Sequence, residues 1–363
     1  MKKIWIGIAA LLLVLAAGAW TWSRPAFQDW LLFKGISRQL KAVAPLAANE
    51  DGIRVILCGT SAPPPSKDRA KACTAVIAGS RIFIVDTGPG SANNLNLWRF
   101  SMNRITAILL THFHSDHIGD LGEINMLSWA AGRSVPLPVY GPDGVQDVVA
   151  GFNQAYRDDE DYRTALHGLP TSGAALVARP FGLASDTQRK MHMADATIID
   201  DNGLKITAFQ VNHEPVYPAV GYRFDYKGRS VVISGDTIKW PNLVRHAMNA
   251  DLLIHEGQSD DERRILAKAL ANAGDRELAK VISQISAYHA TLQDAAAEAN
   301  AAHVQLLVFN HIGPLPPDNA LTRAVVTRGL NSVRSPDAWK LGQDGMVLDL
   351  PARTKDIKHS EIR

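Results

Sequence analysis

The sequence has little cysteine and little net charge. Its 363 residues include two cysteines, Cys58 and Cys73, which are too few for a disulfide-rich scaffold. The 38 basic residues nearly balance the 36 acidic ones, which argues against a protein whose main task is to grip nucleic acid. Hydrophobic residues make up 46% of the chain and charged residues 20%. A disordered or collagen-like chain is therefore excluded, because enough apolar surface exists to build a core.

The first 24 residues differ from the rest of the chain. Two lysines precede a nearly continuous apolar run, residues 4–22, which is close to the roughly 20 residues that span a bilayer as a helix. Positive charge before the run favours a cytoplasmic N-terminus. We expect residues 1–24 to be a signal anchor in the inner membrane, with the remaining chain on the periplasmic side. The alternative is a signal peptide cleaved after the small residues 17–19, which would leave a soluble periplasmic protein.

Export bears on the two cysteines. In an oxidising compartment Cys58 and Cys73 can pair, and a bridge that closes a loop of about 15 residues stabilises a fold by roughly 3 kcal/mol. Two unpaired buried thiols are the alternative. After the N-terminal segment we expect a juxtamembrane linker at 25–52, with a short helix around residues 30–40. A folded domain at 53–352 and a polar C-terminal tail at 353–363 complete the expected organisation.

The folded domain shows short apolar runs between turn signals. Such runs predict strands, and the continuous run Ile105–Leu110 is typical of a strand buried on both faces. The second half of the domain alternates predicted strands and helices, which favours a layered α/β fold with helices outside. We expect the two last runs, Trp339–Leu341 and Met346–Leu350, to pair as a terminal hairpin.

Residues 151–203 are the least regular part of the domain. We expect a helix over Gly151–Leu166 and an irregular loop after it. The segment is long enough to be a lid or a substrate-contacting insertion. A solvated surface excursion is the alternative.

The densest chemical signal follows the predicted strand Ile105–Leu110. Three histidines and an aspartate, His112, His114, Asp116 and His117, fall within six positions. Imidazole nitrogen and carboxylate oxygen are ligands that zinc, manganese and iron accept. Such a cluster rarely arises from packing alone, because buried imidazoles and carboxylates need partners.

Three more candidate ligands, His213, Asp236 and His311, each follow another predicted strand. Each one alone would be an ordinary polar loop residue. Together with the first four they form a set of seven, all at points where strands give way to loops. An α/β protein builds its site along that edge.

This arrangement resembles the metallo-β-lactamase superfamily, whose pattern is His-x-His-x-Asp-His followed by single His, Asp and His residues. The branch it is most similar to is ribonuclease Z with its arylsulfatase-like and phosphodiesterase relatives. The similarity spans about residues 54–350 and includes Cys58-Gly59-Thr60-Ser61, Asp86-Thr87-Gly88 and Tyr288-His289-Ala290-Thr291. The resemblance implies an αββα four-layer sandwich with two divalent metals at one edge, zinc first and manganese or iron as alternatives.

By the same resemblance each of the seven residues has a role. The implied assignment is His112, His114 and His213 at one ion, Asp116, His117 and His311 at the other, and Asp236 between them. A hydroxide bridging two cations would be the nucleophile, since metal coordination lowers the pKa of water from about 16 to about 7.

The resemblance also implies acid–base residues. Asp116 would orient the nucleophile, His289 would protonate the leaving group, and Glu256 would steer His289. Asp86 would hold a ligand histidine through its other ring nitrogen. At these positions the chain departs from ribonuclease Z, reading His255-Glu256-Gly257-Gln258 and His289-Ala290-Thr291.

The expected function is hydrolysis of a sulfate or phosphate ester, with a small anionic ester as substrate. The resemblance also implies that antibiotic cleavage is disfavoured, because Asp236 lies in the Gly-Asp-Thr setting typical of the phosphodiesterase, sulfatase and lactonase members. A ribonuclease Z-like tRNA 3′-processing endonuclease is the alternative. Nucleic acid is disfavoured as a partner because residues 151–190 hold five basic and five acidic residues, with no Gly/Lys-rich arm. Further alternatives are a lactonase and a non-catalytic, membrane-tethered metal-binding protein; the resemblance also allows a homodimer.

Overall fold

The computed structural model describes residues 20–42, 51–183, 190–313 and 319–362, together with the single residues 5, 15 and 18. The chain divides into two compact units, residues 1–47 and 48–363. The smaller unit contains helix α2 (Pro25–Ala42), which begins at a proline and is longer than the short helix expected in the linker. Most of the predicted anchor, 1–24, lies outside the described residues. Among the helices that are described, none combines the length and hydropathy required to span a bilayer, so the anchor stays a prediction.

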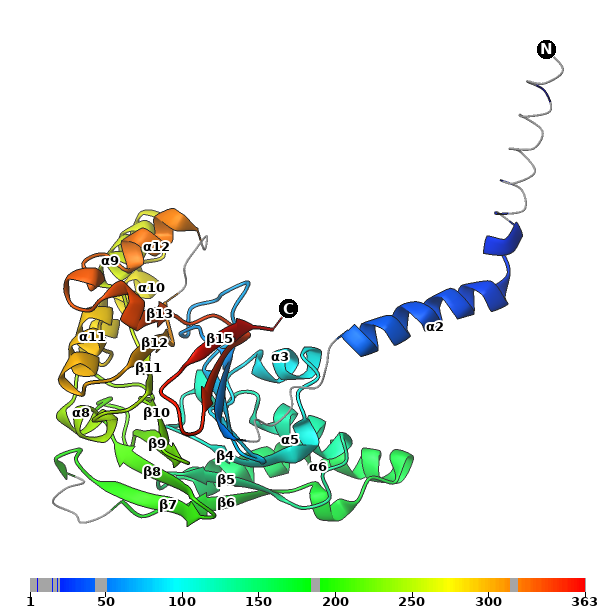
Figure 1. The fold of residues 1–363 in the computed structure, drawn as a ribbon, viewed down its shortest axis with the longest axis horizontal. Helices are drawn as coiled ribbons and strands as arrows, with labels where there is room; N and C mark the ends of the chain where they lie inside the picture. Colours follow the sequence, from blue (N-terminus) through cyan, green and yellow to red (C-terminus); the bar gives the residue numbers. More distant parts are fainter. Residues whose placement is uncertain are drawn as a thin grey trace. The chain divides into compact units, whose positions relative to one another are not determined.

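Two mixed β-sheets form the centre of the larger unit (Figure 1). The first sheet has the order β15 (Lys358–Glu361), β14 (Met346–Pro351), β1 (Gly52–Gly59), β2 (Cys73–Ala78), β3 (Arg81–Val85), β4 (Ile105–Leu109), β5 (Leu137–Gly141) and β6 (Leu176–Pro180). The second has the order β13 (Trp339–Leu341), β12 (Leu306–Asn310), β11 (Leu252–Glu256), β10 (Arg229–Ile233), β9 (Val220–Tyr226), β8 (Leu204–Gln210) and β7 (Asp195–Asp201). Each sheet is parallel in one half and antiparallel in the other, and the parallel strands β3–β6 and β10–β13 carry the connecting helices.

The main hydrophobic core lies between the two sheets. Alternate residues of the strands point into it, such as Val55 and Phe83 from the first sheet and Ile206 and Phe224 from the second, and all four are fully buried. The rings of Phe83 and Phe224 meet with their centroids 5.9 Å apart. Each such side chain contributes about 1.5–3 kcal/mol by leaving water, so the contact between the sheets fixes their relative position and therefore the edge at which the site lies.

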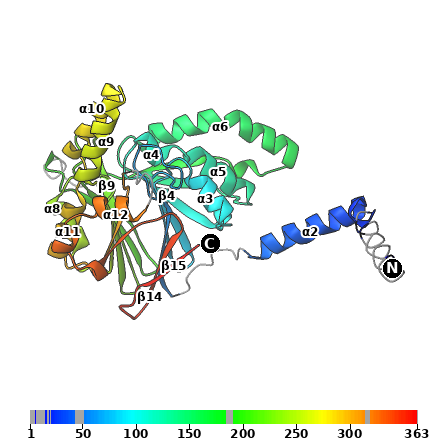
Figure 2. The same cartoon turned by 90° about the horizontal axis from the view of Figure 1, so that it is seen from above.

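Helices cover the outer face of each sheet (Figure 2). The first sheet is covered by α3 (Ser91–Leu97), α5 (Leu121–Ala130) and α6 (Val145–His167). On the second sheet, a further core of Val232, Leu253 and Leu307 packs against α8 (Pro241–Ala247) and α11 (Leu292–Ala301). The remaining helices are α4 (Ser115–Ile118), α9 (Asp260–Asn272), α10 (Arg276–Gln284) and α12 (Ala320–Val326). The order helix, sheet, sheet, helix confirms the predicted four-layer sandwich.

Two local predictions were wrong. The stretch after Leu166, expected as an irregular loop, contains β6 and β7, which close the far edges of the two sheets. The expected terminal hairpin does not form, because β13 pairs with β12 and β14 pairs with β1 in the other sheet. The glycine-bounded segment 342–345 carries the chain from one sheet to the other. Within the expected polar tail, Lys358–Glu361 forms β15 against β14.

Cys58 and Cys73 form a disulfide, which confirms the pairing weighed from the sequence. The bridge joins the end of β1 to the start of β2 and closes the loop between them. Thr291 is the N-cap of α11. Its hydroxyl accepts the backbone N–H of Asp294, and the Asp294 side chain accepts the backbone N–H of Thr291 in return, so α11 begins with a capping box.

Candidate functional site

The first part of the site is delivered by β4. Four of the five residues of this strand are buried. The chain leaves it toward Thr111, whose backbone N–H and hydroxyl both donate to the Asp86 carboxylate at 2.8 Å. His112 and His114 follow in the loop, and Asp116 and His117 lie on the short helix α4. Asp86 itself sits at the end of β3 with a left-handed φ of 59°. The two neighbouring strand ends thus hold each other in place.

The second part of the site comes from the other sheet. His213 follows β8, Asp236 follows β10 and His311 follows β12. Because β10, β11 and β12 are parallel, their carboxyl ends meet at one edge of the sheet. Asp236 and His311 therefore lie opposite the loop from β4, and the site straddles the edge where the two sheets meet.

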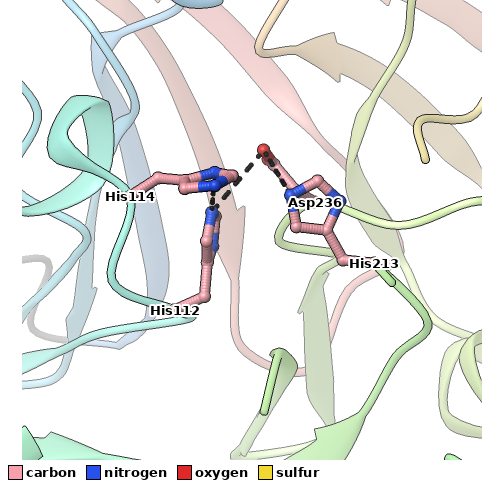
Figure 3. A group of neighbouring side chains, drawn as sticks. All are labelled: His112, His114, His213 and Asp236. Carbon is pink, nitrogen blue, oxygen red and sulfur yellow. Dashed lines mark hydrogen bonds and ion pairs between the residues drawn. The ribbon is translucent and has the colours of Figure 1, made fainter. Parts of the chain in front are cut away.

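One group consists of His112, His114, His213 and Asp236, whose candidate ligand atoms all lie within 4.8 Å of one another (Figure 3). The Nε2 of His112 is 3.0 Å from the Nδ1 of His114. The Oδ2 of Asp236 is 3.8 Å from the Nε2 of His112 and equally far from the Nε2 of His213. Three imidazoles and one carboxylate oxygen thus face a common point.

A second group consists of Asp116, His117 and His311. The Asp116 Oδ2 is 3.1 Å from the Nε2 of His311 and 3.6 Å from the Nε2 of His117. The same Asp236 Oδ2 that faces the first group is 3.3 Å from the His117 nitrogen and 3.5 Å from the His311 nitrogen. The structure therefore brings all seven predicted ligands together, with Asp236 between the two groups.

Hydrogen bonds from behind fix the ring orientations of two histidines. The Nδ1 of His117 is hydrogen-bonded to the Asp86 carboxylate at 2.8 Å, and the Nδ1 of His213 is hydrogen-bonded to the carbonyl of Tyr288 at 2.8 Å. Both contacts leave Nε2 as the nitrogen that faces the cluster. Partners of this kind hold a histidine in the tautomer that a metal requires.

The residues fit a pair of divalent cations. The Nε2 atoms of His117 and His213 are buried and have no hydrogen-bond partner among the described residues. A buried polar atom without a partner costs about 1–3 kcal/mol, so it indicates a ligand. Two ring nitrogens 3.0 Å apart, on His112 and His114, repel each other unless a cation or proton lies between them. A set of imidazoles and carboxylates suits zinc, manganese or iron.

Electrostatics favours the ligand forms of His112, Asp116 and Asp236. At His117 burial lowers the pKa, but the carboxylates of Asp236 and Asp86 outweigh burial and raise it well above its ordinary value. Burial lowers the pKa of His112 well below its ordinary value, and the neighbouring His117 lowers it further. Burial raises the pKa of Asp116, but the hydrogen bond from His311 and the charge of His117 outweigh burial and bring it to about 2. Burial likewise opposes ionisation of Asp236, yet His311 and His117 hold its pKa well below the usual range. A neutral imidazole and an ionised carboxylate are the forms that bind metals.

His289 and Glu256 form a pair beside the seven residues. The Nδ1 of His289 lies 2.9 Å from both oxygens of the Glu256 carboxylate, which also accepts the backbone N–H of Thr237 at 2.6 Å. Because Glu256 occupies Nδ1, Nε2 is the ring nitrogen left for a reacting group. Burial lowers the pKa of His289, but the Glu256 carboxylate more than offsets this and raises it above its ordinary value. The pair can therefore hold a proton next to Asp236, which lies 3.9 Å from the His289 ring.

A cavity of about 500 Å³ adjoins the cluster. His114, Asp236 and His289 form one end of it, and apolar side chains of α9 and α10 form much of the rest. Sequence reasoning missed this cavity. It also missed the Tyr288 carbonyl and Gln258, whose side-chain amide donates to the His311 carbonyl at 2.7 Å. A backbone acceptor leaves no signal in the sequence, and Gln258 stands outside every motif.

Comparison with known proteins identifies the superfamily of this chain and then its branch within that superfamily. The profile of the beta-lactamase superfamily domain matches residues 81–312, which include all seven clustered residues. The chain belongs to the metallo-β-lactamase superfamily, and its site is that of a metal-dependent hydrolase. Within the superfamily it belongs to the ribonuclease Z-like branch. It is 34% identical to a protein named Ribonuclease Z from Mycolicibacterium paratuberculosis, over 72% of this chain and 86% of that protein. It is also 34% identical to Ribonuclease Z from Mycobacterium marinum, over 72% and 87%.

Solved structures agree on the fold. The metallo-beta-lactamase fold protein YhfI from Bacillus subtilis aligns with a TM-score of 0.58 at 18% identity, covering 83% of this chain and all of that one. The short form of human tRNase Z aligns with a TM-score of 0.56 at 23% identity, covering 82% and 99%. These likenesses concern the four-layer architecture, and they leave the substrate open.

Proposed function

We propose that this protein is a two-metal phosphodiesterase that works by ribonuclease Z-type catalysis. The observation that carries the proposal is the convergence of seven ligand side chains, six of them buried and His114 half-buried, beside the His289–Glu256 pair. Two divalent cations held there would activate water as a nucleophile near neutral pH and neutralise charge growing on the phosphoryl oxygens. Asp116, ionised and hydrogen-bonded to His311, is placed to orient the attacking water.

The residues of the chain itself would supply the proton for the leaving group. The Glu256 carboxylate holds His289 by Nδ1 and favours its charged form. Nε2 can then donate to the oxygen that departs as the phosphodiester bond breaks. A positioned general acid of this kind contributes typically about 10²–10⁴-fold to a rate.

The relatives bear on the choice of phosphodiester. Because the similar curated proteins are named Ribonuclease Z, sequence similarity favours the tRNA 3′-processing endonuclease over the sulfate-or-phosphate-ester hydrolase expected first. We therefore take a precursor tRNA as the first substrate to test.

A small phosphodiester is the second candidate, because the cavity next to His289 is walled mainly by apolar side chains. A ribose-phosphate backbone carries a charge on every nucleotide and needs basic contacts. Arg263 is the basic residue in the described lining of this cavity, and its guanidinium is already paired with Asp260.

The test is a substrate panel on the purified full-length protein loaded with zinc or manganese. The panel holds bis(4-nitrophenyl) phosphate, 4-nitrophenyl sulfate, a lactone and a precursor tRNA, with Asp116→Ala as the inactive control. Turnover of either phosphodiester, lost in the control, supports the proposal. Turnover of the sulfate or lactone alone overturns it. Two bound metals without any turnover would favour a metal-binding protein without catalysis.

We also propose that the domain is exported and lies on the periplasmic side of the inner membrane. The apolar run 4–22 behind two lysines and the Cys58–Cys73 disulfide support this location. Export would separate the domain from cytosolic tRNA and so bears on the substrate as well. Protease added to spheroplasts should digest the domain, and protection from the protease would contradict the proposed topology.

A further inference from the structure

The cavity beside the metal cluster has two walls of different origin. One is the helix pair α9–α10 together with the short turn that follows it. This wall contributes six aliphatic side chains: Leu266, Leu270, Leu278, Val281 and Ile282 from the helices and Ile285 from the turn. The other is the proline loop, residues 62–65, which follows β1. The polar end is formed by His114, Asp236 and His289. A volume of about 500 Å³ lies within the range of roughly 300–1,000 Å³ typical of small-ligand sites.

The proline loop is held firmly in place. The Lys71 ammonium donates to the Ser61 hydroxyl at 3.0 Å and to the carbonyls of Ala62 and Pro64 at 2.7 and 2.6 Å. The backbone N–H of Ala62 also donates to the carbonyl of Ile312, next to His311. The Cys58–Cys73 disulfide closes the base of the loop. This wall is therefore fixed relative to the metal ligands.

The helix wall is also ordered from within. Ser259 caps α9, and Asp275 caps α10 by accepting the backbone N–H of Leu278. Between the helices Gly274 adopts a φ of +92°, which a side chain would disfavour, so the chain can reverse tightly. Yet Leu278 and Val281 remain 43% and 51% exposed. Leaving apolar side chains in water beside a reactive centre is costly, and such patches mark binding sites.

The junction between cluster and cavity decides which part of a substrate enters. Tyr288 and His289 lie at that junction, and Ile285 is one turn earlier. If His289 protonates the leaving oxygen, the atoms attached to that oxygen continue past Tyr288 into the aliphatic part of the cavity. The group that departs is therefore the one that the cavity selects.

Building on the proposed phosphodiesterase function, we propose that the cavity is a leaving-group subsite that takes an extended apolar group. The substrate class is a small amphiphilic phosphodiester whose leaving alcohol or phenol carries an alkyl chain. Water attacks phosphorus, the bond from phosphorus to the leaving oxygen breaks, and His289 delivers the proton to that oxygen. The products are a phosphomonoester and an apolar alcohol or phenol.

Two ionisable side chains in the lining, Glu262 and Arg263, are compatible with this class of substrate. Burial raises the pKa of Glu262 to about 7, although Arg69 opposes the effect. A neutral Glu262 tolerates an apolar neighbour, and an ionised one repels an anionic neighbour. The Arg263 guanidinium is already paired with Asp260.

The experiment uses methyl 4-alkylphenyl phosphodiesters, in which the alkyl group is hydrogen, ethyl, butyl, hexyl or octyl. A para-alkyl chain leaves the acidity of the phenol nearly constant, so differences in rate report binding of the chain. We expect kcat/KM to rise about threefold to fourfold per methylene until the cavity is full. Calorimetry of the product phenols with the metal-loaded protein provides a second readout, in which octylphenol should bind more tightly than phenol with a negative heat-capacity change.

Matched variants locate the effect. Leu278→Glu and Val281→Glu place a charge in the cavity at half-exposed helical positions, where a glutamate is compatible with folding. Both should flatten the chain-length dependence, measured as the ratio of kcat/KM for the octyl ester to kcat/KM for methyl phenyl phosphate. Ile265→Glu is the control, because Ile265 lies on α9, is 49% exposed and is not part of the lining. It should keep the wild-type dependence.

The outcomes separate this inference from the proposed function. Phosphodiester turnover that does not depend on chain length overturns the apolar subsite and leaves the phosphodiesterase intact. Absence of all phosphodiester turnover, with octylphenol still bound more tightly than phenol, overturns the phosphodiesterase and supports only the apolar cavity. Cleavage of precursor tRNA that Val281→Glu impairs as strongly as it impairs the octyl ester would assign the cavity to RNA and overturn the inference.

Discussion

At one end of the cavity, seven ligand side chains converge from two sheets. The rings of His117 and His213 are fixed by hydrogen bonds to the Asp86 carboxylate and the Tyr288 carbonyl. At the other end, aliphatic side chains of α9 and α10 lie partly exposed and make no directional contact. Holding a cation pair demands atoms placed to a fraction of an ångström, whereas selecting an apolar group demands only area and shape. Similarity to relatives therefore supports the assignment of the metal-ligand end, whereas the specificity of the apolar end has to be measured with substrates.

The largest effect should come from the residue between the two ligand groups. Asp236→Ala removes the oxygen that lies 3.3–3.8 Å from four ring nitrogens of the cluster. We expect bound metal to fall below two ions per chain and kcat to fall by more than about 10⁴-fold, as for the loss of an essential catalytic unit. Elemental analysis and initial rates measure the two changes. Asp158→Ala, in an exposed ion pair on α6, is the control. If the Asp236→Ala variant still bound two ions per chain, Asp236 would not be the residue that bridges them.

His289→Ala tests the boundary between the two ends. If His289 protonates the leaving group, its loss should slow esters of poor leaving groups by about 10²–10⁴-fold and 4-nitrophenolate esters far less. Glu256→Gln keeps the shape of the partner but removes its charge, so it should lower the pKa of His289 and shift the falling limb of the pH–rate profile to lower pH. An equal loss for good and poor leaving groups would show that His289 only shapes the site.

The architecture and the ligand set were largely readable from the sequence, because both depend on strands with strong local signals. The His112–His117 motif follows a strand with four of its five residues buried, and the other three ligands also follow strands with clear apolar patterns. The predictions that were wrong concern strands at the edges of the sheets. No residue of β7 is fully buried, so its apolar pattern is weak. The pairing of β13 was mispredicted because a short glycine-bounded connection suits a hairpin as well as a crossing between sheets.

The rest of the site could not be read from the sequence for a different reason. Tyr288 acts through a backbone carbonyl and Gln258 through one amide contact, and neither role depends on a motif. The cavity arises where α10, the proline loop and the cluster meet, three segments distant in the chain. Their juxtaposition is a property of the folded sandwich, and helical amphipathicity in α9 and α10 is equally compatible with an ordinary packed face.

The Cys58–Cys73 disulfide constrains one wall of the cavity, because it closes the loop that contains the proline loop. The double variant Cys58→Ser/Cys73→Ser should lose roughly 3 kcal/mol of unfolding free energy, as expected for a loop of this length. Urea unfolding of wild type with and without reductant gives the matched comparison. The variant should also discriminate less between octyl and unsubstituted phenyl esters, while metal content stays the same. Unchanged stability in reductant would show that the bridge does not constrain the chain.

The smallest effect concerns Glu262, the carboxyl inside the apolar end. Its folded pKa of about 7 lies above the ordinary 4.5, so the folded protein binds the proton more tightly than the unfolded chain does. Unfolding free energy should therefore fall as pH rises from about 4.5 to 7, with the penalty complete above pH 7. Since Glu262 is only partly buried, we expect about 1–2 kcal/mol. Glu262→Gln has no such proton, so its stability advantage over wild type should grow between pH 5 and pH 8.5. Glu277→Gln, on the exposed first turn of α10, is the control for chemical denaturation at the two pH values. If Glu262→Gln exceeds the wild type in unfolding free energy by the same amount at pH 5 and pH 8.5, the Glu262 carboxyl is solvated. The apolar end of the cavity would then contain more water than its lining indicates.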